Sequence, residues 1–381
     1  MSGSLETTES RLYQYFEQLE DPRSSVNRKH LLVDIVVISI CGILSGADGA
    51  DAIAVWAKAR LPWLQQFLKL PCGLPSKDCL RRVLNALNPQ GFQACFQAWL
   101  ESLADSEAHR FLSIDGKTLR RSHNPARGLG ALHLVSVWSH AAKLTLAQVA
   151  TGAKSNEITA IPQLLDLIAL KGAVVTIDAI GTQREIASQI IAGGGDYILP
   201  TKGNQPTLEA AVRAEFDQVL ESETGHRKVS VLETEEQAHG RLEKRTYWLM
   251  NVPPTFPKRG EWQGLQTLGM VIRTREINGV ETGEVQYYIG SIKRHVQTFA
   301  TATRGHWGIE NTCHWSLDIT FREDEKRTRT GHGAENEAWL RRFTLGLLKQ
   351  HPDQKLSLAM KRRKAGWDET FLTEVVFGVT T

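Results

Sequence analysis

Apolar side chains recur at helical spacing through the N-terminal part of this chain. The most apolar run, residues 31–44, is too short to span a bilayer and is therefore expected to form a buried helix. Further helices are predicted at 10–20, at 51–70 with an interruption at Pro62, at 79–87 and at 92–100. Residues 1–104 are thus predicted to form an all-helical domain. They hold no catalytic constellation, so a role in binding or dimerisation is expected.

After residue 104, short apolar runs begin to alternate with amphipathic helices. Strands are predicted at 111–115, 131–139 and 144–150, and the last two are expected to form a hairpin. The order then continues with a helix up to 168, a strand at 173–178, a helix at 182–192, a strand at 196–199 and a helix at 206–221. Alternation of this kind predicts an α/β layer with a mixed sheet over residues 105–226.

Residues 227–292 return to strand-like alternation. Strands are predicted at 228–232, 241–250, 265–273 and 284–289, and Asn278-Gly279 is a strong signal for a hairpin turn. This block is interpreted as a β-rich insertion that divides the α/β core. Residues 293–350 are predicted to be the second, helical part of that core, and residues 351–381 are expected to form a basic C-terminal tail.

The most unusual pattern lies between residues 304 and 318. Ile309, Cys313 and Leu317 form an apolar stripe at i, i+4, i+8 spacing, which predicts a helix. A neighbouring stripe at the same spacing combines imidazoles with acids: His306, Glu310, His314 and Asp318. Solvated helix faces usually alternate Lys with Glu, so this stripe is unusual. Taken alone, it is explained more simply as the half-buried edge of an amphipathic helix.

Two further acids, Asp115 and Asp178, each close a short apolar run that is predicted to be a strand. If the first and fourth strands are neighbours, both carboxylates project beside each other, and Glu310 completes a set of three. That arrangement is the ribonuclease H-like fold. The β-rich insertion lies before the last catalytic helix, and it accounts for the long separation of Asp178 and Glu310 along the chain.

Three carboxylates placed in this way offer hard oxygen ligands, which suit divalent cations such as Mg²⁺. Two such ions roughly 3.5–4 Å apart orient a nucleophile and neutralise the charge that develops on a phosphate during phosphodiester hydrolysis or transfer. Asp115 is expected to bridge both ions, with Asp178 on one and Glu310 on the other. Mg²⁺ is therefore the expected cofactor, with Mn²⁺ as a substitute.

Composition and charge refine this prediction. With 41% hydrophobic and 23% charged residues, the chain resembles an ordinary soluble globular protein. It shows no membrane-spanning run, no signal pattern and no close pairing among its five cysteines, so a cytoplasmic location is expected. The net charge is only +3, but basic residues cluster just after Asp115 and between residues 341 and 364. Basic segments near acids suit a protein that holds a polyanion against a metal site, although either run alone fits a solvated face equally well.

Several segments in combination resemble the H-repeat-associated, or ISAs-type, insertion-sequence transposases. They are residues 113–120, 154–157, 176–179, 196–197 with 202–205, and 306–311 with 314–315 and 317–318. The resemblance runs from near Leu31 to Leu348. It implies a DDE enzyme with the triad Asp115, Asp178 and Glu310, which cleaves DNA strands and transfers them during transposition of an insertion sequence.

The resemblance also implies partners and a location. Double-stranded DNA is expected as the partner, both as the ends of the insertion sequence and as the target. Two ends must be brought together, which implies a homodimer or a larger assembly on DNA and a DNA-binding or dimerisation role for the N-terminal domain. The expected place is the bacterial cytosol, in association with the nucleoid.

Candidate DNA contacts are polar residues near the three acids. They are Lys117, Arg120, Arg121, Lys154, Lys202, Asn204, Gln205, His306, Asn311 and Arg322. The group at 202–205 precedes a helix N-terminus, where backbone N–H groups favour phosphate. The group at 154–157 is explained more simply as a helix cap, and a role near the metals stays open. Better-known relatives carry an Arg four residues before the Glu and a Lys seven after it. His306 and Leu317 stand there instead, so those roles are not transferred, and a phosphate-contact or positioning role for His306 is a hypothesis.

Other classes of function stay open from the sequence. One is a transposase-derived protein that binds DNA but no longer cleaves it, and another is a domesticated ribonuclease H-like nuclease. A glycoside hydrolase also uses paired carboxylates, but it needs neither a basic surround nor a third acid on a helix.

Overall fold

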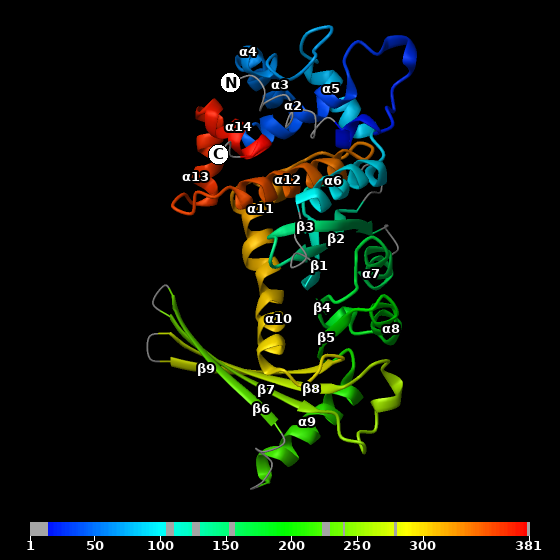
Figure 1. Cartoon of the computed structure of the whole chain (residues 1–381), viewed down its shortest axis with the longest axis vertical. Coiled ribbons are helices and arrows are strands. Elements are labelled where there is room, and N and C mark those ends of the chain that lie inside the picture. Colours follow the sequence, from blue (N-terminus) through cyan, green and yellow to red (C-terminus); the bar gives the residue numbers. More distant parts are fainter. Residues whose placement is uncertain are drawn as a thin grey trace.

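The computed structural model describes residues 14–103, 110–123, 130–151, 157–222, 229–238, 241–277 and 280–378. The described strands form one sheet with the order β3-β2-β1-β4-β5-β9-β8-β7-β6 (Figure 1). A helical unit lies beyond the β3 side of this sheet, and strands β6 to β9 lie at the opposite end of the molecule. No helix within the described ranges is long and apolar enough to cross a bilayer.

The first five strands form the expected α/β core. They are β1 (Phe111–Leu119), β2 (Leu132–Ser139), β3 (Leu144–Thr151), β4 (Val174–Ile177) and β5 (Asp196–Thr201). β2 runs antiparallel to both β1 and β3, whereas β4 is parallel to β1 and β5 is parallel to β4. The first and fourth strands are therefore neighbours, as predicted, and the ribonuclease H-like fold class is confirmed.

Strand β1 is longer than the sequence pattern indicated. Its pairing with β4 ends at Ile114, but its pairing with β2 continues to Leu119. Asp115 consequently lies inside the strand, opposite Ser136, and the predicted end of this strand at residue 115 is wrong. The hairpin with β2 supplies backbone hydrogen-bond partners that a short apolar run does not reveal.

The β-rich block extends the core sheet and is not a separate layer. Its strands are β6 (Val229–Ala238), β7 (Arg241–Asn251), β8 (Thr267–Ile277) and β9 (Val280–Gly290), all antiparallel to their neighbours. β9 joins the core by pairing with β5 only from Tyr287 to Gly290. The rest of these long strands projects past the core as a four-stranded ribbon (Figure 1). The predicted turn at Asn278-Gly279 lies outside the described residues.

Helices cover both faces of the core sheet. One face carries α7 (Glu157–Asp166) and α8 (Arg184–Ala192), and α9 (Pro206–Glu221) packs on β5 and β9. The other face carries a continuous rod of α10 (Val296–Gly308), the π-helical turn η7 (Ile309–His314) and α11 (Trp315–Ile319). The predicted helix at 304–318 therefore contains a π-helical turn at its centre.

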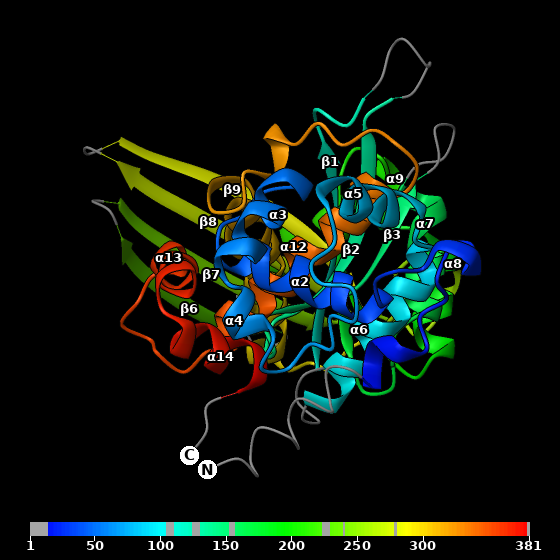
Figure 2. The same cartoon turned by 90° about the horizontal axis from the view of Figure 1, so that it is seen from above.

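The helical unit is built from both ends of the chain. Its N-terminal members are η1 (Ser25–Asn27), α2 (Leu32–Leu44), α3 (Ala50–Ala59), α4 (Leu61–Leu64), α5 (Lys77–Ala86) and α6 (Pro89–Leu103). Its C-terminal members are α12 (Gly333–Gln350), α13 (Leu358–Trp367) and α14 (Glu369–Phe377). Every residue of α2 is buried, as predicted for the apolar run, and α3, α12, α13 and α14 pack on it (Figure 2).

The expected basic tail at 351–381 is wrong for the part that the structure describes. Side chains of Ser357 and Asp368 cap α13 and α14, and the apolar face of α14 is buried. Three arginines of the basic run 341–364 are buried in ion pairs. The pairs are Arg341 with Glu337 at 2.7 Å, Arg342 with Glu323 at 2.9 Å and Arg362 with Asp48 at 3.0 Å. Much of this positive charge therefore stabilises the fold and does not face a polyanion.

The Glu323–Arg342 pair, whose side chains are fully buried, gives a stability prediction. We expect Glu323→Ala to lower the free energy of unfolding by about 3–5 kcal/mol, because it leaves a buried guanidinium without its carboxylate. Urea unfolding would measure the loss. Replacing both partners, as Glu323→Leu with Arg342→Met, should restore most of it. The matched control is exposed Glu325→Ala, which should change stability by less than about 0.5 kcal/mol. An equal effect of the two Glu→Ala variants would contradict the prediction.

Candidate active site

The polar stripe of the α10–η7–α11 rod faces the sheet. Side chains alternate across a strand, so Ser113, Asp115 and Lys117 of β1 project on one face. The rod covers that face: His314 lies against Asp115 and Asp318 pairs with Lys117 of β1, and His306 lies against Thr176 of β4. The unusual composition of the stripe thus reflects buried polar contacts with a strand.

The contacts of Asp115 and Lys117 hold the C-terminal part of the rod, around His314 and Asp318, against the sheet. The carboxylate of Asp115 lies 3.4 Å from Nδ1 of His314. Burial is the main cause that lowers the pKa of His314 to about 3, so this imidazole is neutral and can donate a hydrogen bond to Asp115. The buried ammonium of Lys117 lies 2.8 Å from the carboxylate of Asp318 and 3.4 Å from that of Asp324.

A hydrogen-bonded network holds the C-terminal end of α10, around His306, against the sheet. The hydroxyl of Ser113 lies 2.7 Å from Nε2 of His140 and 2.8 Å from the hydroxyl of Thr176. The Thr176 hydroxyl lies in turn 3.2 Å from Nδ1 of His306. A Cβ on Gly305 would fall 1.7 Å from the His140 ring, so only glycine lets α10 approach the sheet this closely.

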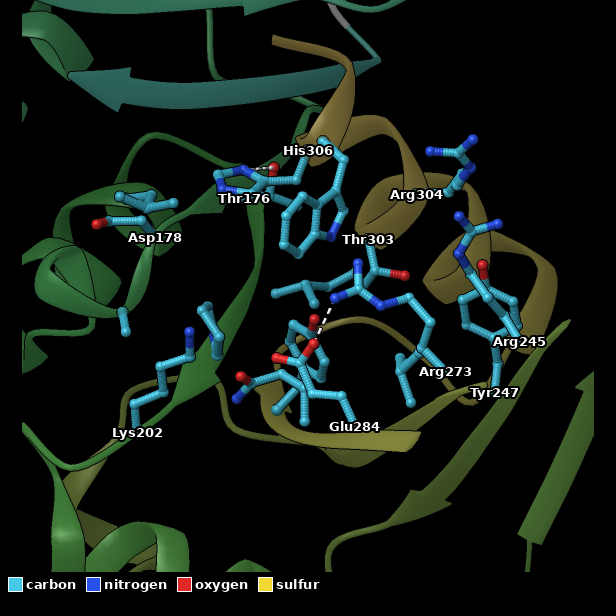
Figure 3. Close-up of a pocket in the computed structure, with 18 of the residues that line it drawn as sticks. Thr176, Asp178, Lys202, Arg245, Tyr247, Arg273, Glu284, Thr303, Arg304 and His306 are labelled. Carbon is cyan, nitrogen blue, oxygen red and sulfur yellow. Dashed lines mark hydrogen bonds and ion pairs between the residues drawn. The ribbon is translucent and has the colours of Figure 1, made fainter. Parts of the chain in front are cut away.

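Asp178 and Glu310 border a common pocket at the carboxyl ends of β4 and β5 (Figure 3). Asp178 follows β4 directly, and its side chain accepts a hydrogen bond of 3.2 Å from the backbone N–H of Gly181. Glu310 comes from the other wall, in the π-helical turn, where its side chain is exposed. Lys202 of the loop after β5 lines the pocket near Asp178.

The acids act on one another electrostatically. The pKa of Asp115 is raised to about 7, mainly by burial and also by the negative charges of Glu310, Asp178 and Glu157, while a backbone hydrogen bond from Gly116 opposes the rise. The pKa of Asp178 is raised by burial and then by Glu157. Glu157, the first residue of α7, lies 2.7 Å from Nε2 of His133. The three predicted acids therefore share one region of negative charge with Glu157, which the sequence favoured as part of a helix cap while leaving open a role near the metals.

The donor chemistry fits a divalent cation, although the side chains are not gathered around one point. Within the described ranges, no three His, Cys, Asp or Glu side chains lie close enough together to hold an ion. Carboxylates are nevertheless the hard oxygen donors that Mg²⁺ prefers, and a cation would relieve the repulsion that the other acids exert on Asp115. π-Helical turns are frequent at functional sites, and here the turn carries Glu310.

The candidate contacts at 202–205 divide into two kinds. Lys202 is exposed at the pocket and can meet a phosphate. Asn204 instead donates from its side chain to the carbonyl of Ala179, and Gln205 donates to that of Thr182 at 3.0 Å. These two amides brace the loop that follows Asp178, and their expected contact with DNA stays a prediction.

The other candidate DNA contacts differ in burial, in charge and in pairing. Lys117 is buried between two carboxylates, so its expected contact with DNA is corrected to a structural ion pair. Burial lowers the pKa of His306 to about 4, so its neutral ring offers no positive charge to a phosphate. Lys154 and Asn156 lie outside the described residues. The remaining candidates, Arg120, Arg121, Asn311 and Arg322, are exposed. Two of them form ion pairs, Arg120 with Asp324 and Arg322 with Glu325.

Sequence reasoning missed the contribution of the insertion to the pocket. Arg245 and Arg273 on the ribbon and Arg304 on α10 line the wall across from Asp178 (Figure 3). The guanidinium of Arg273 lies 4.9 Å from the centre of the Trp307 ring and is also paired with Glu284. The sequence pattern of an individual β-strand does not reveal these residues as pocket residues, because it is the pairing of β9 with β5 that brings the ribbon beside the acids.

Comparison with known proteins gives the family. The family model described as a transposase DDE domain matches residues 106–347, and the model described as DDE_Tnp_1-associated matches residues 13–100. The "H repeat-associated putative transposase YhhI" of Escherichia coli K12 is 35% identical over 97% of this chain and 98% of its own length. The "Putative transposase YncI" of Escherichia coli O157:H7 is 36% identical over 96% of this chain and 94% of its own.

Among solved structures, the piggyBac transposase synaptic complex with hairpin DNA aligns with a TM-score of 0.39 and 10% identity over 96% of this chain and 76% of its own. The two sequence relatives and the DDE-domain match each cover most of the chain. With its ribonuclease H-like sheet and its facing acids, the chain belongs to the family of transposases with a DDE domain, which are DNA-cutting enzymes.

Proposed function

We propose that this transposase cleaves and transfers the strands of an insertion sequence by metal-dependent phosphoryl transfer at Asp115, Asp178 and Glu310. The observation that supports the proposal most is the raised pKa of Asp115. Its causes are burial and the charges of the other acids, Glu310 and Asp178 among them. Acids far apart in the sequence thus influence one another across the sheet and the rod, and a site with strongly perturbed carboxylates is a candidate for chemistry.

The three acids would hold Mg²⁺, or Mn²⁺ in its place, and the ions would orient the attacking oxygen and neutralise charge on the transferred phosphate. Asp115 is held by β2 on one side and by His314 on the other, and Asp178 by the N–H of Gly181. The side chain of Glu310 makes no hydrogen bond or ion pair with the residues that the structure describes. Its carboxylate is therefore available as the third metal ligand beside Asp115 and Asp178.

The DNA is expected to meet exposed cations near these acids. Lys202 lines the pocket beside Asp178, and Arg120 and Arg121 follow the end of β1. Positive side chains at such places bind the phosphates of double-stranded DNA without reading its sequence. A homodimer or larger assembly in the bacterial cytosol would bring the two ends of the element and the target together.

Substitution of the acids tests this assignment. We expect Asp178→Asn to lower the rate of Mg²⁺-dependent nicking of end-containing DNA by at least about 100-fold, since a loss of 10–100-fold is common even for residues that only support a ligand. DNA affinity should be retained. Glu185→Gln removes an exposed acid from α8 and is the matched control. Full activity of Asp178→Asn would rule out its role. A wild-type protein that binds DNA but never nicks it would support the non-cleaving alternative.

The raised pKa of Asp115 predicts a stability that depends on pH and metal. The folded carboxyl titrates at about pH 7 and the unfolded one near 3.9, so between these values the folded state binds more protons and loses stability as pH rises. Asp115→Asn keeps a neutral side chain. We therefore expect the variant to gain roughly 1–3 kcal/mol over the wild type between pH 5 and pH 8 without metal.

Mg²⁺ should reverse this difference. Bound to the ionised acids, it should raise the melting temperature of the wild type at pH 8 and leave Asp115→Asn almost unchanged. Differential scanning calorimetry at both pH values, with Mg²⁺ or with EDTA, measures both effects. Equal responses of the two proteins to pH and to Mg²⁺ would remove Asp115 from the metal site.

A further inference from the structure

A second pocket lies on the same face of the sheet as α10, next to the turn between β2 and β3. Gly305, Gly308 and Thr312 of the rod form one side of it, and the end of α12 with the chain leading into α13 forms the other. Trp138 of β2 also lines it. It shares no lining residue with the pocket of Asp178 and Glu310. In Figure 1, α13 and the projecting ends of β6 to β9 lie on the same side of α10.

The charge of this pocket is one-sided. Three of its lining residues are lysines, Lys143, Lys349 and Lys361, and none of the lining residues is an acid. Lys143 lowers the pKa of both other ammonium groups by repulsion, in addition to the effect of their burial. Asp353, outside the lining, raises the pKa of Lys361. Like charges held together in this way leave an unfavourable interaction that a bound anion would remove.

Lys349 is held in place on the wall of the pocket. Its ammonium lies 4.7 Å from the centre of the Trp138 ring and donates a hydrogen bond of 2.6 Å to the carbonyl of Thr312. Burial, together with Lys143, lowers the pKa of Lys349 to about 8. An ammonium has three N–H donors, so those not used by Thr312 are available to a ligand. Thr312 belongs to the same π-helical turn as Glu310.

The rim of the pocket has space for a ligand beside Gly308 and carries the exposed ammonium group of Lys143. Lys143 stands at the β2–β3 turn with a φ of +54°, is exposed, and has no partner among the residues that the structure describes. A Cβ on Gly308 would meet nothing within 4 Å, so the rod presents bare backbone to the pocket at this position. Lys361 is already bound to the carbonyl of His351 at 2.8 Å, and its charge still contributes to the pocket.

We propose that the pocket formed by Lys143, Lys349 and Lys361 binds a backbone phosphate of the DNA substrate, at a point removed from the catalytic acids. This inference rests on the proposed function, because that function supplies DNA as the polyanion. Ammonium groups without acids among them suit a phosphodiester, whose recognition by point charges requires no base sequence. The site would hold the DNA on the far side of Gly305 and Gly308 from the pocket of Asp178.

Lys143→Gln tests the proposal, because this side chain is exposed and its removal does not disturb the core. Binding of a fluorescent DNA duplex to the full chain is measured by anisotropy across a range of salt concentrations, with EDTA present so that no strand is cut. We expect the variant to bind several-fold more weakly at physiological salt. The slope of log K against log salt should be shallower by about 1, the effect of one lost phosphate contact.

Lys171→Gln is the matched control, since it removes an exposed lysine from the loop before β4, away from α10. Its affinity and salt slope should equal those of the wild type. Equal binding by wild type and Lys143→Gln would overturn the proposal and leave the catalytic assignment intact. A wild type that binds no DNA would instead overturn the proposed function, and this inference with it.

A second measurement does not depend on substitution. Acylation of surface lysines, read by mass spectrometry, should slow at Lys143 and Lys349 when duplex DNA is added and should be unchanged at Lys171. Inorganic phosphate is the third arm. If it protects these two lysines at millimolar concentration while DNA does not, the pocket binds a small anion and the proposal for DNA is wrong.

Discussion

The packing of the α10–η7–α11 rod on strand β1 is the contact on which the site depends. Asp115 meets His314, Lys117 meets Asp318, and the network of Ser113 and Thr176 reaches His306. Polar groups in such a buried contact must find partners, since a lost partner costs about 1–3 kcal/mol and more for a charged group. These pairings therefore fix the register of the rod on the sheet, and with it the position of Glu310 opposite Asp178.

The insertion changes the site by extending the sheet. Because β9 pairs with β5, the ribbon of β6 to β9 becomes a wall of the pocket that Asp178 opens into. Arg245 and Arg273 reach the pocket from that wall, and Arg304 reaches it from α10 and pairs with Glu236 of β6. The insertion thus contributes side chains to the candidate site as well as length to the chain.

Much of this arrangement could be predicted from the sequence, because it follows from local periodicity. The succession of strands and helices in the core and the buried helix at 31–44 follow from apolar runs, and the neighbouring positions of Asp115 and Asp178 follow once the ribonuclease H-like fold is inferred from that succession. What failed depends on contacts between distant segments. Lys117 reads as a free cation until Asp318 is placed beside it, and the basic run at 341–364 reads as a surface until Glu323 and Asp48 neutralise it. Nor does spacing alone show that a π-helical turn interrupts the helix of Glu310.

The helical unit has a consequence for synthesis of the protein. The apolar helix α2 emerges early from the ribosome, but α12, α13 and α14, which cover it, are translated some three hundred residues later. Until then its apolar surface lacks its final partners, and a nascent chain would need a chaperone or provisional contacts to protect it. Closure of the helical unit therefore follows synthesis of the α10–η7–α11 rod, so the segment that carries Glu310 is made before the two ends of the fold are joined.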